Sequence, residues 1–341
     1  MALLEANNLS IDYETDEDRI RAVNDVSFEV KENQRFGLVG ESGCGKTTIA
    51  KSILRLLPDN GIIAEGEINY KGDNLVQLSE EELRQRRWNE ISIISQSAMN
   101  ALNPVYTVSK QITEAIHIHE QDTTEKEARD RAEELIKEVG LDEERLDSYP
   151  HQLSGGMRQR VMIAMAMALE PPLILADEPT TALDVITQDH ILARIETTAE
   201  EMQSSLLMIT HDISVVAETC DTIGVMYAGE LVEVGPTNKV LTEPEHPYTQ
   251  GLLNAYPTIE GGSSDLITIL GEPPDLKSRP EGCAFYDRCP YREEDCRTNR
   301  PRLTERSGAK HEAACFVTER GESINEGFDS MMEETDKWLR L

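Results

Sequence analysis

A glycine-rich stretch at residues 40–47, Gly-Glu-Ser-Gly-Cys-Gly-Lys-Thr, constrains the fold of this 341-residue chain more than any other feature. A loop of this pattern wraps backbone N–H groups around a phosphate, Lys46 reaches the β- and γ-phosphates, and the Thr47 hydroxyl ligates magnesium. The apolar segment 35–39 predicts a buried strand before the loop, and the helical spacing of residues 49–57 predicts a helix after it. This order predicts an α/β domain that binds a nucleotide phosphate.

Two adjacent carboxylates, Asp177 and Glu178, end a second short apolar segment at residues 173–176. A purely structural explanation is weak, because an unpaired buried charge is costly. We expect Asp177 to hold magnesium through a water molecule. We expect Glu178 to polarise the attacking water as a general base.

Gln96 and His211 also follow apolar segments, at residues 91–95 and 206–210. A lone histidine is usually structural. The placement of both residues at the sheet edge expected for Asp177 favours a functional interpretation. We expect Gln96 to contact magnesium and the attacking water, and His211 to hold the γ-phosphate.

The turn Ser154-Gly155-Gly156 opens a helical segment that is rich in Met and Ala. Such a turn presents backbone N–H groups to an anion. The phosphate loop already accounts for phosphate binding in the chain's own site, so this second anion-binding turn has no evident ligand there. We therefore expect an active site that two chains share.

Short apolar segments alternate with helical ones along most of the chain, which predicts a parallel α/β sheet. Alternating apolar and polar residues over 1–35 predict edge strands, and residues 64–96 are interpreted as strand and turn. Helical patterns at 108–118, 124–139 and after Ser154 predict a helical insertion at about 97–165. Further elements are expected as a helix at 187–199 and strands at 205–210 and 222–227. A change to Gly, Pro and Ser after Pro257 marks a domain boundary near residue 255.

Composition indicates where the protein is located and which partners it can bind, more than which reaction it catalyses. No stretch approaches 18 consecutive apolar residues and no signal peptide is recognisable, so a cytosolic protein is expected. The net charge of −31 disfavours nucleic acid and anionic membrane surfaces as partners. Acidic residues recur along the whole chain, which favours a solvated acidic shell, as in proteins of a halophile, over an acidic partner-binding surface.

Four of the six cysteines, Cys283, Cys289, Cys296 and Cys315, cluster near the C-terminus. In a reducing cytosol such a set favours metal ligation over disulfides. Four thiolates suit either tetrahedral zinc or an iron–sulfur cluster, and the spacing lacks the CxxC pairs typical of structural zinc. Unligated cysteines remain a third alternative. His311 is left out, because four cysteines already complete a site.

The order of phosphate loop, Gln96, Ser154-Gly155-Gly156, Asp177-Glu178, Ala182-Leu-Asp184 and His211 resembles the ABC transporter ATPase family over residues 3–255. The resemblance implies a P-loop NTPase with a RecA-like core, an antiparallel β subdomain and a helical subdomain. It also implies head-to-tail dimers, in which Ser154, Gly155 and Gly156 of one subunit bind the γ-phosphate held by the other, while Asp184 communicates between the two sites. Tyr13 takes the place of the aromatic residue that stacks on adenine. The other ATP contacts implied are Gly40, Glu41, Ser42, Gly43, Cys44, Gly45, Lys46, Thr47 and Thr48, of which Cys44 contributes its backbone.

Three further strings, Gln96–Pro104, Tyr149–Met157 and His246–Gly251, resemble the dipeptide/oligopeptide importer ATPases. That group implies an ATP-hydrolysing subunit on the cytoplasmic face of the cell membrane. The implied partners are a second ATPase subunit that is a paralogue, two transmembrane permease subunits, of which one contacts the helical insertion, and an extracellular solute-binding protein. Residues 282–290 resemble the C-terminal region of the same ATPases, some of which carry a 4Fe–4S cluster. A Cys-rich extension at residues 256–341 and an iron–sulfur cluster are therefore expected beside ATP and Mg²⁺.

Other functions remain open beside peptide import. Relatives of this subfamily also serve nickel and some sugars, so the solute is not fixed by the ATPase. A soluble ABC ATPase of DNA repair, chromosome organisation or translation is disfavoured, because those chains carry two modules or a long coiled coil. A regulatory subunit without turnover conflicts with the presence of Glu178 and His211.

Overall fold

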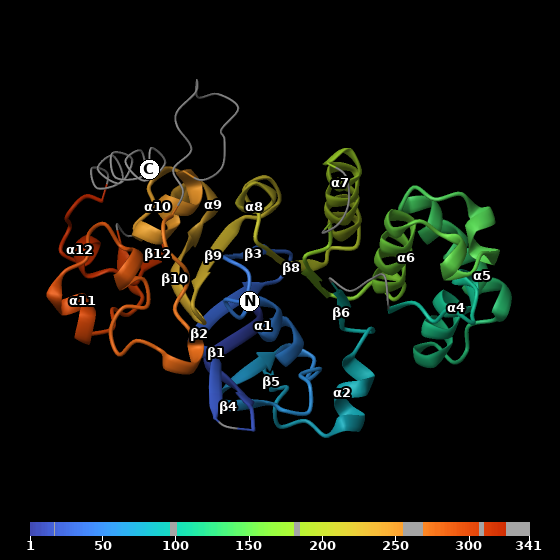
Figure 1. Cartoon of the computed structure of the whole chain (residues 1–341). Helices are drawn as coiled ribbons and strands as arrows, with labels where there is room; N and C mark the ends of the chain where they lie inside the picture. Colours follow the sequence, from blue (N-terminus) through green and yellow to red (C-terminus); the bar gives the residue numbers. More distant parts are fainter. Residues whose placement is uncertain (17, 96–100, 181–184, 255–268, 307–309, 325–341) are drawn as a thin grey trace. The chain divides into compact units, whose positions relative to one another are not determined.

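In the computed structural model (Figure 1) the chain divides into two compact units, each made of three separate stretches of the sequence. The first comprises Met1–Leu4, Val30–Arg35 and Tyr70–Ile209, and the second Glu5–Glu29, Phe36–Asn69 and Thr210–Leu341. The structure describes residues 1–16, 18–95, 101–180, 185–254, 269–306 and 310–324. Among these residues no helix is long and apolar enough to cross a membrane.

Three parallel strands form the sheet of the first unit: β6 (Ile91–Ile94), β7 (Leu173–Asp177) and β8 (Ser205–Thr210). Every residue of β7 and β8 is buried, as continuous apolar runs require when both faces of a parallel sheet are covered. Asp177 is the last residue of β7 and lies opposite Ile209 in the register. The strands predicted at 91–95, 173–176 and 205–210 are thus present, and Asp177 ends its strand as expected.

The helices of the first unit include a group that Figure 1 shows side by side: α4 (Val108–His119), α5 (Glu125–Glu138) and α6 (Gly155–Met167). Each helix is preceded by a capping residue whose side-chain hydroxyl accepts a hydrogen bond from a backbone N–H of the first turn. These capping residues are Thr107 for α4, Thr124 for α5 and Ser154 for α6. The 3-10 turns η1 (Glu143–Asp147) and η2 (Pro150–Gln152) connect α5 to α6, and α7 (Val185–Glu201) connects β7 to β8.

One helix of the first unit contradicts the sequence-based interpretation. Residues 64–96 were expected to form strand and turn, yet α2 (Glu80–Arg86) follows β5 (Asp73–Asn74). The helix begins with a capping box, in which Ser79 accepts from the Glu82 N–H and Glu82 accepts from the Ser79 N–H. Ser79 and Glu82 stand three residues apart, so this signal was present in the sequence and was missed.

The second unit contains the strand that leads into the phosphate loop. β3 (Arg35–Val39) pairs in parallel with β9 (Thr222–Tyr227), which pairs antiparallel with β10 (Glu230–Pro236). β10 pairs in turn with β12 (His311–Ala313), and β12 with β11 (Thr304–Arg306). The C-terminal part of the chain therefore extends the sheet that carries the phosphate loop.

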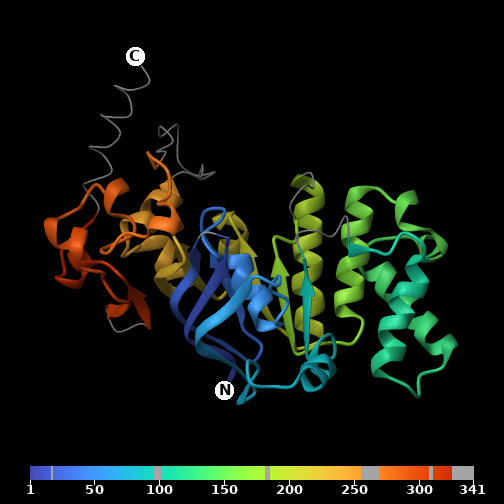
Figure 2. The same ribbon diagram turned by 60° about the horizontal axis from the view of Figure 1, so that its bottom comes forward.

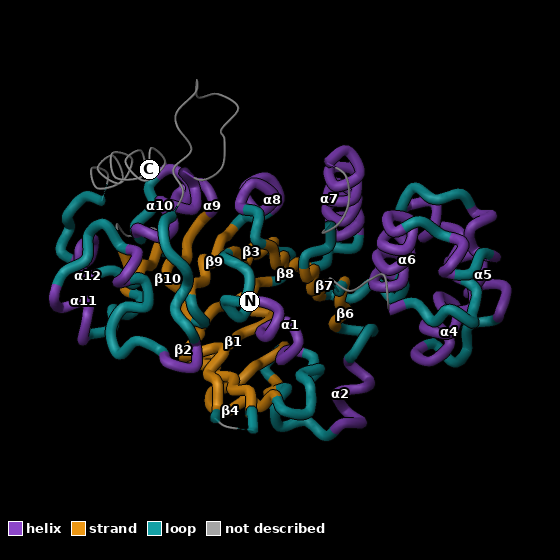
Figure 3. The backbone as a smooth tube through the Cα atoms, viewed as in Figure 1, coloured by secondary structure: helices purple, strands orange, loops and turns teal. Residues whose placement is uncertain are grey.

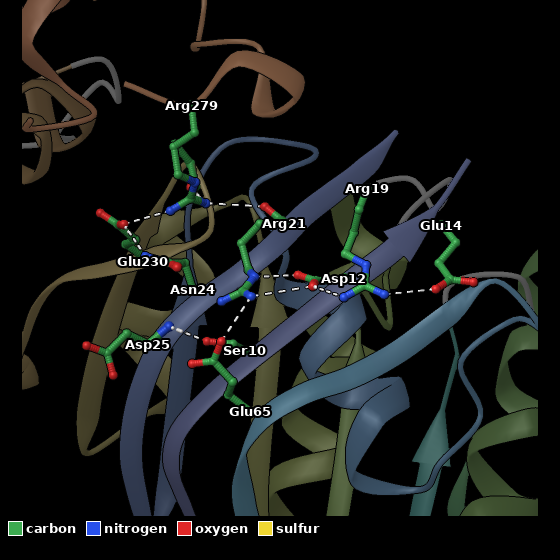
Figure 4. Close-up of polar contacts among 11 residues, drawn as sticks. Ser10, Asp12, Glu14, Arg19, Arg21, Asn24, Asp25, Glu65, Glu230 and Arg279 are labelled. Carbon is green, nitrogen blue, oxygen red and sulfur yellow. Dashed lines mark hydrogen bonds and ion pairs between the residues drawn. The ribbon is translucent and has the colours of Figure 1, made fainter. Parts of the chain in front are cut away.

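The N-terminal strands β1 (Ala2–Glu14), β2 (Arg19–Lys31) and β4 (Gly61–Tyr70) form a second sheet, with β1 between β2 and β4 (Figure 2). Figure 4 shows ion pairs on this sheet. Asp12 is almost fully buried and is paired with Arg19 and Arg21, as a buried carboxylate requires. Arg21 also bonds Glu65 on β4, at 3.2 Å.

We call residues 269–324 the C-terminal extension. Figure 3 shows that much of it is loop. Besides β11 and β12 it contains η3 (Leu276–Ser278), η4 (Tyr286–Arg288), α11 (Glu294–Thr298) and α12 (Phe316–Glu319). A fully buried carboxylate, Glu233 on β10, accepts hydrogen bonds from the N–H groups of Glu245 and His246 and lies 2.7 Å from His311 Nε2. His311 therefore joins the extension to β10.

The remaining helices of the second unit are α1 (Lys46–Ile53), α8 (Ile213–Thr219), α9 (Thr237–Thr242) and α10 (Pro247–Asn254). The helix expected at 49–57 is thus α1, which starts and ends earlier than the sequence indicated. α1 begins directly after the glycine-rich loop, so the loop is placed between β3 and the N-terminus of a helix as predicted.

Candidate nucleotide site and cysteine pocket

The phosphate loop depends on glycine at two positions. A Cβ atom on Gly40 would lie 2.1 Å from the Met226 carbonyl oxygen. Gly45 has φ +103°, and a Cβ there would lie 2.7 Å from the Ala22 carbonyl oxygen. No side chain fits at either position, so the loop exposes backbone in place of side chains.

Lys46 is the first residue of α1 and is 4% exposed. Its ammonium donates to the carbonyl oxygens of Gly40 at 2.6 Å and Glu41 at 2.9 Å, which hold it within the loop. The N-cap residue Gly45 makes no side-chain hydrogen bond to the first turn of α1. A helix N-terminus beside a buried ammonium fits nucleotide phosphates by its charge.

Two other predicted ATP contacts lie beside the start of α1. The Tyr13 hydroxyl is 3.2 Å from the Thr48 hydroxyl, which places the aromatic ring near the first turn of the helix. The Cys44 thiol is buried, and burial raises its pKa. Burial therefore favours the neutral thiol of Cys44 inside the loop.

The two carboxylates lie in the first unit, at the end of β7. Asp177 is 2% exposed. Glu178 follows it with φ +46°, in the left-handed region, and its N–H donates to the Ile209 carbonyl at 2.7 Å. Backbone strain of this kind is uncommon for a residue with a long side chain and clusters at functional sites. The structure therefore fixes the backbone of Glu178 by the neighbouring strand.

The Ser154-Gly155-Gly156 turn is the N-terminus of α6, as the sequence predicted. Ser154 is exposed and caps the helix by accepting from the Met157 N–H at 3.3 Å. One turn further along, the Gln159 amide donates to the carbonyl of Pro179, directly after the two carboxylates. α6 is thus hydrogen-bonded to the loop that follows Glu178.

Other predicted site residues have simpler outcomes. His211 directly follows β8, and Gln96 and Asp184 lie outside the described residues. The phosphate loop, Tyr13 and His211 belong to the second unit, and Ser154, Asp177 and Glu178 to the first. Sequence reasoning gave no role to Arg288 and knew Tyr248 only as part of the string 246–251, yet both contact Glu41 of the loop.

The four clustered cysteines line one small, apolar pocket of the second unit. It has room for about one water molecule, with a volume of about 20 Å³. Across the described part of the chain, no three His, Cys, Asp or Glu residues lie close enough together to hold a single metal ion. A mononuclear zinc site, one of the alternatives from the sequence, therefore finds no support.

Burial changes the chemistry of these thiols. It raises the pKa of Cys283 to about 12 and also raises the pKa of Cys289 and Cys315. Neighbouring cysteines act in the same direction on all three, because several thiolates in one pocket would repel one another. The raised pKa of Cys283, Cys289 and Cys315 favours the neutral thiol at these three residues.

Comparisons with known proteins agree with this geometry. The ABC transporter family matches residues 23–181, and the oligopeptide/dipeptide transporter C-terminal region matches residues 232–296. The probable peptide ABC transporter ATP-binding protein of Sinorhizobium fredii is 45% identical over 318 residues, covering 92% of this chain and 94% of that protein. The dipeptide transport ATP-binding protein DppD of Bacillus subtilis is 42% identical over 318 residues, with the same two coverages.

A solved structure of similar fold is the dimeric ATP-binding cassette MJ0796 in a post-hydrolysis state bound to ADP and Pi. It matches with a TM-score of 0.63 at 31% identity, over 69% of this chain and 98% of that one. The phosphate loop on its strand and helix, and this likeness, confirm the expected ABC ATPase fold. This chain belongs to the ABC transporter ATP-binding proteins. Within them it belongs to the group whose members carry the oligopeptide/dipeptide transporter C-terminal region.

Proposed function

We infer that this protein is the ATP-hydrolysing subunit of an ABC importer for peptides. The observation that carries this inference is the presence of two matches in one chain. An ABC transporter domain holds the phosphate loop, and an oligopeptide/dipeptide transporter C-terminal region begins on β10. Relatives with the same arrangement over more than nine-tenths of their length are named as peptide and dipeptide transport ATP-binding proteins.

Hydrolysis is proposed to proceed by in-line attack of water on the γ-phosphate. Lys46 and the N–H groups of α1 bind the β- and γ-phosphates, and Glu178 accepts the proton of the attacking water. His211 and Gln96 orient the γ-phosphate and the water. Thr47, Gln96 and Asp177 are the residues that would hold Mg²⁺, which supplies charge neutralisation for the phosphates when bound.

The shared active site is proposed to form in a head-to-tail dimer. Ser154, Gly155 and Gly156 of one subunit then complete the γ-phosphate site of the other, and Asp184 communicates between the two sites. Support comes from the exposed N-cap residue Ser154 at the start of α6 and from the dimeric assembly named for the cassette MJ0796. The partner subunit is proposed to be a paralogue.

The transporter context adds further partners. Two permease subunits, one of them against the helical insertion at 97–165, and an extracellular solute-binding protein complete the proposed importer. The protein is proposed to sit at the cytoplasmic face of the membrane. Its ATPase domain is proposed to span residues 1–255, and its Cys-rich extension residues 256–341. Cycles of dimer closure on ATP and opening after hydrolysis then alternate the access of the permeases.

A 4Fe–4S cluster is proposed for Cys283, Cys289, Cys296 and Cys315. The support for it is that the four thiols line one pocket. Binding there would supply a covalent link between distant parts of the extension and would consume thiolates that burial otherwise disfavours. The pocket has to widen around it, because the present volume is that of one water molecule.

The acidic composition is proposed to reflect a high-salt cytoplasm. The net charge of −31 is spread over the whole chain, so counter-ions are needed along the whole surface to limit self-repulsion.

Co-purification of the membrane complex tests the proposed function. The complex is expected to contain two permeases and a second ATPase chain, and mass spectrometry of its solute-binding protein is expected to find peptides. Finding nickel or a sugar in place of peptides would reject the proposed solute. Finding no permease at all would reject the importer.

A further inference from the structure

Glu41, the second residue of the phosphate loop, is held from outside the loop. Its N–H donates to the Tyr248 hydroxyl at 2.9 Å. Its carbonyl accepts from the Lys46 ammonium at 2.9 Å. Its two carboxylate oxygens accept from Arg288 Nη1 and Nη2, both at 2.9 Å. Each polar group of Glu41 thus has a partner, and Arg288 comes from the C-terminal extension.

Arg288 is committed to this position by its other contacts. It is 7% exposed, and its remaining donors reach the Tyr227 hydroxyl at 3.2 Å and the carbonyls of Leu270 and Ile269. All five N–H donors of the guanidinium are therefore used. Burial lowers the pKa of Arg288, but the hydrogen bonds to Glu41 and Tyr227 outweigh it and the pKa is raised. A bidentate pair of this kind fixes direction as well as charge.

Tyr248 is fixed by aromatic packing. Its ring lies 4.6 Å from the ring of Tyr227 and 5.6 Å from that of Phe285. Phe285 also lines the cysteine pocket, and Arg288 directly precedes Cys289. Residues 285–289 of the extension therefore contribute to the support of the phosphate loop and to the cysteine pocket.

A carboxylate in the phosphate loop is a liability for binding a polyanion, because like charges repel. Arg288 offsets this charge and holds the carboxylate in a fixed direction. We propose that Arg288 is a positioning residue of the nucleotide site, through which the C-terminal extension sets the affinity for MgATP. This proposal rests on ATP binding alone and does not depend on which solute the importer carries.

The test is a charge-rescue experiment on the full chain, read as the dissociation constant for MgATP by isothermal titration. Arg288→Gln is expected to weaken MgATP binding about tenfold, because an unpaired Glu41 carboxylate remains in the loop. Arg288→Gln combined with Glu41→Gln is expected to restore most of the affinity, because that charge is gone. Arg288→Lys is expected to fall between, since an ammonium cannot reproduce the bidentate pair.

The matched control is Arg300→Gln, which removes another ion pair of the extension. Arg300 lies 2.8 Å from Glu230 and donates to the Pro280 carbonyl, and neither residue belongs to the phosphate loop. We expect a small loss of melting temperature and an unchanged dissociation constant. Arg288→Gln binding MgATP within twofold of the wild type would overturn the proposal. So would a double variant that binds no better than Arg288→Gln, because a merely structural loss is not rescued by removing Glu41's charge.

Discussion

The phosphate loop and the cysteine pocket are both sites of the second unit, but they are encoded in different ways. The loop consists of consecutive residues whose backbone N–H groups are proposed to bind phosphate, with Gly40 and Gly45 close to carbonyl oxygens. The pocket gathers four side chains from a segment of 33 residues, Cys283 to Cys315, held together by loops and short elements. The ligand of a site built from consecutive backbone groups can be predicted from a short stretch of sequence. For a site built from dispersed side chains, the sequence predicts only the donor atoms.

The largest expected effect concerns the chemistry that the loop serves. Glu178→Gln is expected to lower kcat for ATP hydrolysis by about a thousandfold, because the general base is lost, and to leave MgATP affinity within a few-fold. Steady-state hydrolysis and equilibrium binding measure the two quantities. Glu134→Gln, an exposed carboxylate on α5, is the control and should hydrolyse normally. Wild-type turnover in the Glu178 variant would remove it from the mechanism.

The backbone character of the loop is tested by glycine substitution. Gly45→Ala is expected to weaken MgATP binding by more than tenfold, because its Cβ meets the Ala22 carbonyl and its φ of +103° is strained by about 2 kcal/mol or more. Gly72 is the control, with φ +88° and no atom within 4 Å of its Cβ position. Gly72→Ala should lose stability without losing affinity. Equal binding by both variants would contradict the account of the loop.

The side-chain character of the pocket is tested by pH on metal-free protein. Burial raises the pKa of Cys283 to about 12, above the value of about 8.5 for an unfolded thiol. The folded state therefore keeps its proton longer, and stability should fall as pH rises from about 8.5 toward 12. Cys283→Ser should reduce the loss between pH 8 and pH 10 by about 2 kcal/mol, measured by urea unfolding. An unchanged pH dependence would mean that the thiol is not buried as described.

The smallest expected effect is that of salt on stability, which depends on the acidic surface and not on either site. Raising KCl from about 0.1 M to about 2 M is expected to raise the melting temperature by about 5 °C, since salt screens repulsion among the acidic residues. Calorimetry measures it. A melting temperature that falls with KCl would contradict the proposed high-salt adaptation. It would not bear on the description of the phosphate loop or of the cysteine pocket.

The fold and much of the loop could be predicted from sequence because their signals are local. The strands at 173–177 and 205–210 are continuous apolar runs, and the loop residues are consecutive. The pairing of β12 with β10 and the contact of Glu233 with His311 join residues about 80 positions apart, and no local pattern specifies such partners. The string His246-Pro-Tyr248 could be matched to a subfamily, but its hydrogen bond to Glu41 required the structure.

The central claim is that this chain couples ATP hydrolysis to the uptake of peptides. The most direct measurement is uptake of a labelled dipeptide into proteoliposomes that contain the complete transporter and its solute-binding protein. We predict accumulation that needs MgATP on the side of this subunit and that disappears with Glu178→Gln. MgATP-dependent accumulation of nickel or a sugar, with no peptide uptake, would contradict the claim.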